Sequence, residues 1–278
     1  MVKMSKLIDC KRGILFSLGL MLLSSVILLL AVLIFHNAQK AEEIIGKLIV
    51  LDRVYDLDNS IQKSVSDIFM IKSGISINIT NNSVFFEEIL PNDNLELLNS
   101  SMFGFKNFVE NNISNINLTI TNVEELPLIV IPQRITYAHK DNWSNVEVVP
   151  ESMNFNGYSL IIDTDKNVSC VWDVNSGSLN FSLEVRGDVI NCDFTSEMID
   201  PSVENEIRID SIEEGNIMII KTFDNGKLSI NLTRDISIAA RTGLLISQPQ
   251  IDVLASSIVL GLDFKEFGIY EEKKVKII

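Results

Sequence analysis

The chain has 278 residues, 46% of them hydrophobic, and a formal net charge of −14. The charge is unevenly divided, because the first 13 residues carry +3, which leaves −17 on the rest. So acidic a surface repels phosphate, which excludes nucleic acid and anionic lipid headgroups as partners of the C-terminal part. The length is sufficient for one large folded domain or two small ones.

Residues 14–35 form an apolar run of 22 residues without a charged residue, Asn, Gln or Pro. At about 1.5 Å per residue, a helix of this length spans the hydrocarbon layer of a bilayer, which is about 30 Å thick. The run is too long for a secretory signal peptide, and Cys10 precedes it, which excludes a lipoprotein anchor. We therefore predict a transmembrane helix in the cell membrane. The positive-inside rule places 1–13 in the cytoplasm and the C-terminal part outside the cell.

The basic tail ends in Cys10-Lys11-Arg12-Gly13, directly before the apolar run. This arrangement resembles the class III leaders of type IV pilin-like proteins, including the archaeal ones, and the resemblance covers about the first 70 residues. In that family a membrane peptidase cuts after the glycine, so the resemblance implies cleavage between Gly13 and Ile14. Leu18 stands at the fifth mature position, where many pilins carry Glu. The alternative is a stop-transfer flank, in which Lys and Arg are also common.

The segment that follows the apolar run has a helical period. Apolar residues recur every three or four positions, at Ile44, Leu48, Leu51, Val54, Leu57, Ile61, Val65 and Ile68. This period predicts an amphipathic helix over 36–73 that continues the transmembrane helix and ends at Gly74. The pilin-like resemblance implies that such a stem packs under a β-rich head, and a coiled-coil stalk is the alternative.

From residue 74 on, the apolar period changes from 3.6 to 2, which predicts β-strands. The predicted strands are 75–80, 83–89, 116–121, 126–137, 158–163, 168–174, 179–185, 189–194, 206–212, 217–223 and 227–232, and 253–262 is a core strand or short helix. One helix is predicted between Pro91 and Asn111. The fold class is therefore α+β, mainly β, with an antiparallel sandwich or jelly roll over 74–278. The poorly periodic segment 140–156 is the candidate boundary if this head has two lobes.

Glycosylation sequons of the form Asn-x-Ser/Thr are frequent, and all lie in the part predicted to be exported. Their asparagines are Asn78, Asn81, Asn99, Asn112, Asn117, Asn142, Asn167, Asn180 and Asn231. The number favours a glycosylated surface protein. A polar outer strand face gives the same pattern, because residues two apart in a strand share one face. Both explanations place the asparagine side chains in solvent.

Cys170 and Cys192 are the two cysteines that follow the apolar run. Each alternates with apolar residues in its predicted strand, so both thiols are expected to face inward. Outside the membrane two such thiols can form a disulfide. The alternative is a pair of buried free thiols.

Residues that could support catalysis are few. The chain has two histidines, His36 and His139, and no nucleophile elbow, zinc-binding His-Glu-x-x-His, phosphate-binding glycine loop or Cys-x-x-Cys. We therefore expect no enzymatic activity, no cofactor and no metal site.

The sequence is consistent with three hypotheses about function. The first is an anchored cell-surface protein with a glycosylated head and a structural or interaction role, which contacts the bilayer through 14–35. The second is a pilin-like filament subunit that contacts copies of itself or other envelope proteins. The third is a carbohydrate-binding or adhesin head, which rests on fold class alone.

Overall fold

The computed structural model describes residues 3–121, 123, 127–140, 144–151, 155–187, 189–190, 192, 194–234, 236–247, 251–265 and 268–277. The chain divides into two compact units, Met1–Asn59 and Ser60–Ile278. The second unit contains the end of the first helix, a second helix and all the strands that the structure describes.

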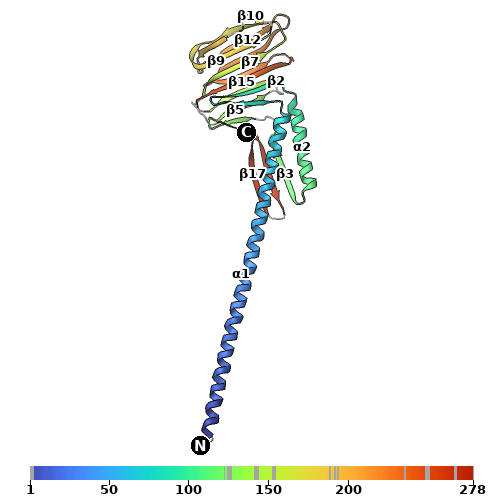
Figure 1. Ribbon diagram of the computed structural model, residues 1–278. Helices are drawn as coiled ribbons and strands as arrows, with labels where there is room; N and C mark the ends of the chain where they lie inside the picture. Colours follow the sequence, from blue (N-terminus) through green and yellow to red (C-terminus); the bar gives the residue numbers. More distant parts are fainter. Residues whose placement is uncertain are drawn as a thin grey trace. The chain divides into compact units, whose positions relative to one another are not determined.

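Helix α1 spans Lys3–Lys72 without interruption (Figure 1). Its last turns bury Ile61, Val65 and Phe69, whose spacing of four residues places them on one face. The helix ends where the backbone amide of Ser73 donates to the Phe69 carbonyl at 2.9 Å, and Gly74 follows with a φ of 69°. Glycine adopts this left-handed conformation without a steric penalty, and many helices end at a glycine in this conformation. The long apolar N-terminal helix of the predicted fold class is confirmed.

One sheet of the second unit has six strands among the described residues. In spatial order they are β1 (Ser76–Ile79), β2 (Ser83–Leu90), β15 (Ile238–Ile246), β7 (Phe155–Asp163), β9 (Ser176–Arg186) and β11 (Phe194–Ile199). All neighbouring pairs are antiparallel except β7 and β9, which run parallel.

The other sheet has eleven strands in the same part of the chain. Its order is β10 (Val189–Ile190), β8 (Val168–Asp173), β12 (Asn205–Ser211), β13 (Gly215–Phe223), β14 (Lys227–Leu232), β6 (Asn145–Pro150), β5 (Ile135–Lys140), β4 (Leu128–Ile131), β16 (Asp252–Phe264) and β17 (Ile269–Lys276). Strand β3 (Ile116–Thr121) pairs with the second half of β16, whereas β4 pairs with its first half. Because β16 is shared in this way, β3, β16 and β17 form a three-stranded extension of the sheet.

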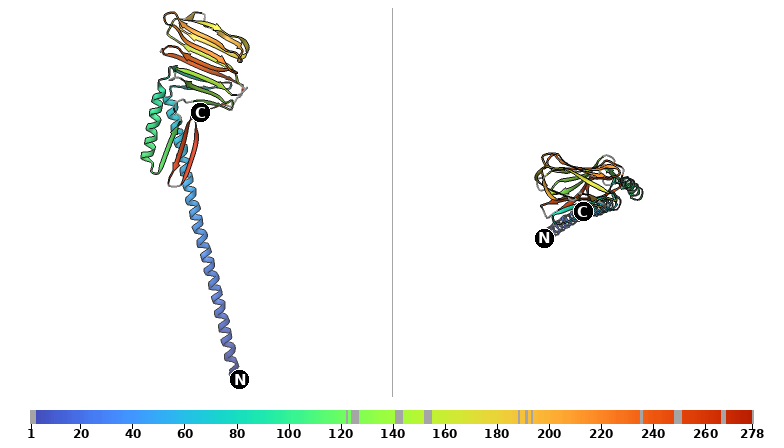
Figure 2. Two further views of the ribbon diagram at one scale, coloured as in Figure 1. Left: turned by 180° about the vertical axis from the view of Figure 1, so that it is seen from behind. Right: turned by 90° about the horizontal axis from the view of Figure 1, so that it is seen from above.

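Helix α2 spans Asn94–Asn112 and lies along β3 in two opposite views (Figures 1 and 2). Its buried face consists of Leu95, Leu98, Met102 and Val109. Near its end the Glu110 carboxylate accepts a hydrogen bond of 3.1 Å from the backbone amide of Leu118. The helix predicted between Pro91 and Asn111 is therefore present, displaced by one to three residues.

Side chains of the two sheets meet in the core of the second unit. The rings of Phe86 on β2 and Tyr137 on β5 stack with centroids 4.2 Å apart. The hydroxyl of Tyr158 on β7 donates to the carbonyl oxygen of Gly226, between β13 and β14, at 2.5 Å. All these side chains are fully buried, so apolar burial between the sheets is the main stabilising term. The α+β, mainly β, fold class with predominantly antiparallel pairing is confirmed.

Several strand predictions need correction. The predicted strand 126–137 is two strands, β4 and β5, because the chain turns at Pro132 and Arg134 has a φ of 52°. Strand β6 lies in the segment 140–156, which looked aperiodic, and it pairs with both β5 and β14. The predicted strand 189–194 contains β10 and the first residue of β11, which belong to different sheets. Strands β6, β15 and β17 were not predicted.

Candidate functional site

The first candidate site is the apolar surface of α1. Every described side chain from Phe16 to Phe35 is exposed, including Leu28 at 68% and Phe35 at 65%. This part of α1 is long and apolar enough to cross a membrane. So large a continuous apolar surface in water is strongly unfavourable and indicates a lipid or protein environment. The predicted cleavage residues Gly13 and Ile14 lie within α1.

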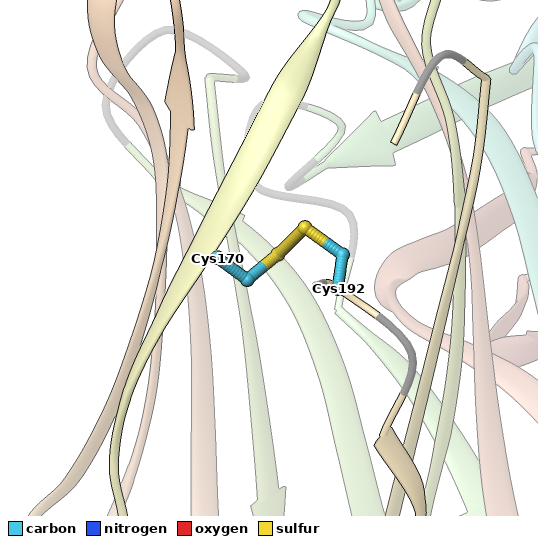
Figure 3. Close-up of a disulfide and its surroundings, with 2 residues drawn as sticks. All are labelled: Cys170 and Cys192. Carbon is cyan, nitrogen blue, oxygen red and sulfur yellow. A yellow bond between two sulfur atoms is a disulfide. The ribbon is translucent and has the colours of Figure 1, made fainter. Parts of the chain in front are cut away.

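The second feature is a disulfide between Cys170 and Cys192 (Figure 3). Cys170 lies on β8 of the eleven-stranded sheet, and Cys192 lies between β10 and β11. Since β10 pairs with β8 and β11 pairs with β9, the chain passes from one sheet to the other at this point. The disulfide therefore attaches the segment that crosses between the sheets to the edge of the eleven-stranded sheet, where that segment begins. Cys192 is fully buried.

The sequon asparagines are distributed over the second unit rather than gathered in one patch. Six have exposed side chains, namely Asn78, Asn81, Asn99, Asn112, Asn117 and Asn167. Asn180 and Asn231 are half-buried, and Asn142 lies outside the described residues. In β3 both Asn117 and Thr119 are exposed and point to one face, as expected for residues two apart in a strand. Exposure of these side chains is compatible with both explanations of the sequon number.

The third candidate site is a buried polar cluster centred on Glu88, which no sequence motif indicated. The Glu88 carboxylate accepts hydrogen bonds from the Tyr137 hydroxyl and from His139 Nε2, the latter at 2.7 Å. A third donor is the Asn92 side-chain amide at 2.9 Å. The side chains of Glu88 and His139 have zero exposure.

The cluster connects four parts of the second unit through Asn92. The Asn92 amide also donates to the Ser73 carbonyl at 2.9 Å, directly after α1. The Asn92 side-chain oxygen accepts from the Asn94 backbone amide at 3.2 Å, at the start of α2. Glu88 belongs to the six-stranded sheet, whereas His139 belongs to the eleven-stranded sheet. The cluster therefore joins both helices and both sheets through hydrogen bonds.

Burial changes the acid–base properties of two tyrosines near this region. Burial, together with the nearby Glu88 carboxylate, raises the pKa of Tyr137 well above its ordinary value. The buried Thr242 hydroxyl of β15 bonds to the Tyr137 hydroxyl and opposes this shift in part. Burial alone raises the pKa of Tyr158 well above its ordinary value. Both tyrosines therefore stay protonated hydrogen-bond donors near neutral pH.

The sequence did contain a signal for the cluster. In the pattern of β2, Val84, Phe86 and Glu88 share one face, so a carboxylate stands at a core position. In β5, Ile135, Tyr137 and His139 likewise share the buried face. A charged residue at an inward strand position requires a buried partner. Alternation alone identifies Glu88 and His139 as candidates, but not as partners of each other.

Comparisons with protein-family models, with curated proteins and with solved structures found no match for this chain.

Proposed function

We propose that the chain is a single-pass membrane protein of the cell surface. In this proposal residues 14–35 of α1 cross the bilayer, residues 1–13 stay in the cytoplasm, and a β-sandwich-like head with a structural or interaction role lies outside. The observation that carries the proposal is the unbroken exposed apolar surface from Phe16 to Phe35. Transfer of such side chains from water to lipid is favourable by about 25 cal/mol per Å² of apolar surface.

The disulfide and the charge distribution support this orientation. A bond between Cys170 and Cys192 is stable in an oxidising compartment outside the cytoplasm. The basic residues of the first 13 positions precede the helix, where the positive-inside rule retains them in the cytoplasm. Six exposed sequon asparagines in the head are accessible to glycosylation enzymes of an exported protein.

A non-catalytic role is supported by the closed environment of the Glu88 cluster. A general acid or base has to come within hydrogen-bond distance of its substrate. Glu88 and His139 have zero side-chain exposure and are occupied by partners inside the head. Their hydrogen bond connects the two sheets, as expected for residues with a structural role.

Cys10 provides a direct test of the orientation, because the other two cysteines are joined in the disulfide. We expect a membrane-impermeant maleimide to leave Cys10 unlabelled in intact cells and to label it after permeabilisation. Protease added to intact cells should degrade the head and leave an N-terminal fragment in the membrane. Labelling of Cys10 in intact cells would contradict the proposed orientation.

A second candidate is a pilin-like filament subunit, favoured by Lys11-Arg12-Gly13 directly before the apolar run. In that case copies of the chain rather than lipid would cover the apolar surface of α1 after cleavage between Gly13 and Ile14. Sequencing the N-terminus of the native protein separates the two candidates. A chain that starts at Ile14 supports the filament route, and a chain that retains residues 1–13 excludes it.

A further inference from the structure

The extension formed by β3, β16 and β17 has a polar outer face with an exposed aromatic ring. Asn117 on β3 is paired with Asp263 on β16, which in turn is paired with Tyr270 on β17. Paired residues point to the same face of a sheet, so these three side chains form one row across the extension. The opposite face is apolar and buried, with Leu118 and Leu262 among its members.

Gly261 leaves an open position beside this row, and Tyr270 leans over it. A Cβ atom at Gly261 would lie 3.2 Å from the Tyr270 hydroxyl and 2.3 Å from the Thr119 hydroxyl. Glycine at this position therefore lets the tyrosine side chain approach the strand. The Tyr270 hydroxyl donates to the Glu272 carboxylate at 3.0 Å, yet 63% of the tyrosine remains exposed. One face of the ring is therefore available for contact.

Asn117 is held on the same outer face by its neighbours. The backbone amide of Leu118 donates to Glu110 at 3.1 Å, and the Thr119 hydroxyl donates to the Gly261 carbonyl at 3.2 Å. Asn117 itself is exposed and begins the sequon Asn117-Leu118-Thr119. Adjacent strands lie about 4.8 Å apart, so Asn117 is about 10 Å from the β17 backbone. Part of that distance is covered by the Tyr270 side chain, because its hydroxyl lies over Gly261 of the intervening strand β16.

We propose that Asn117 carries an N-linked glycan whose first sugar packs on the ring of Tyr270. This inference rests on the proposed export of the head, which exposes it to a glycosyl transferase. In the transfer, Asn117 Nδ2 forms a bond to the anomeric carbon of a phosphate-activated, lipid-linked sugar. The bond from that carbon to the phosphate oxygen breaks, the phosphate leaves with the electron pair, and the amide loses one proton.

The chemistry of this face fits a sugar in two ways. The C–H face of a pyranose ring is apolar and matches an exposed aromatic ring, which combines an apolar surface with a polar edge. The hydroxyl groups of a sugar require hydrogen-bond acceptors, and Asp263 and Glu272 supply carboxylates on the same outer face. The glycan would thus be ordered on the extension rather than free in solvent.

A thermodynamic cycle on the full-length protein, purified in detergent from the cells that produce it, tests the proposal. Mass spectrometry first measures the glycan occupancy of the Asn117 peptide. We then expect Asn117→Gln to lower Tm by about 2 to 4 °C when Tyr270 is present, the shift that loss of one aromatic contact gives at this size. In the Tyr270→Ala background the same substitution should leave Tm unchanged.

Two further variants of Tyr270 complete the cycle. Tyr270→Phe keeps the ring and loses only the hydrogen bond to Glu272, so Asn117→Gln should still lower Tm in this background. If Tyr270→Ala does not fold, Tyr270→Leu replaces it in the cycle, because leucine covers Gly261 without an aromatic ring. An unmodified Asn117 peptide, or an equal loss of Tm with and without the ring, overturns the inference. Neither outcome tests the proposed orientation of the chain in the membrane, which the labelling of Cys10 tests independently.

Discussion

The Glu88 carboxylate on β2 and the His139 imidazole on β5 form a hydrogen bond of 2.7 Å between the two sheets, with both side chains fully removed from solvent. Removal of one partner from such a pair takes one hydrogen bond from a buried polar group, which typically costs about 1 to 3 kcal/mol. The pair therefore fixes how the sheets are placed on each other.

We predict that His139→Leu lowers the free energy of unfolding by about 1 to 3 kcal/mol, because Glu88 loses one of its donors inside the core. The double variant Glu88→Leu/His139→Leu should lose less than the sum of the two single variants, because it leaves neither member of the pair behind. Guanidinium unfolding of the full chain in detergent, followed by tryptophan fluorescence, measures the differences. Asp252→Asn is the control, since its pair with Lys276 at 3.0 Å is exposed and should not contribute measurably. Additive losses would contradict coupling of the two residues.

Alkaline pH should destabilise the head through Tyr137 and Tyr158. Burial raises the pKa of both in the folded state, whereas in the unfolded state tyrosine ionises near pH 10. Below about pH 10 both states hold the proton and the full stability is present. As the pH rises above that value the unfolded state alone loses protons, so each tyrosine removes about 1.4 kcal/mol per pH unit. Unfolding midpoints between pH 9 and pH 11 measure the slope, which Tyr158→Phe should reduce by about half. A flat profile would exclude the mechanism.

Reduction of the disulfide should destabilise the head without destroying its sheets. The bond joins residues 22 apart in the sequence, for which the chain-entropy model gives about 3 kcal/mol. We expect a reducing agent to lower the Tm of the wild-type protein. Its effect should vanish in the Cys170→Ser/Cys192→Ser variant, which should already unfold at the lower temperature. Alkylation of both residues in denatured, non-reduced protein would show that the bond is absent.

The sequence predicted those parts of the fold that depend on local pattern. A 3.6-residue period predicted the helices, and a period of two predicted the strands after residue 74. The pairing of the strands could not be predicted, because the alternation of residues within a strand does not show which other strand lies beside it. In β2 and β15, for example, Phe85 pairs with Gly243, far away in the chain. Such pairing depends on the packing of the whole core.

Two of the unpredicted strands, β15 and β17, show why pattern alone was insufficient. Strand β15 contains Arg241 and Gly243, which interrupt its apolar residues. The structure tolerates Arg241 because its guanidinium lies 4.2 Å from the Phe85 ring centroid and 3.1 Å from the Glu87 carboxylate. Strand β17 is at the edge of its sheet and carries charged residues that discourage pairing with another chain. In the same way, the pairing of Glu88 with His139 could not be predicted, because the two residues lie far apart in the sequence.

One chemical change at two glycines should have opposite effects on stability. Gly157 has a φ of 154°, and a Cβ atom there would lie 1.8 Å from the backbone oxygen of Asn180 on the parallel neighbour β9. A rigid backbone atom cannot move aside, so Gly157→Ala should cost about 2 to 4 kcal/mol through strain and loss of pairing.

Gly104 lies in α2 with no atom within 4 Å of an added Cβ, and Ala is the better helix former by up to about 1 kcal/mol. Gly104→Ala should therefore raise the unfolding midpoint in the same denaturant titration in which Gly157→Ala lowers it. A destabilising Gly104→Ala would show that this part of α2 is covered by a partner in the folded protein, because the added methyl group has free space in the isolated chain.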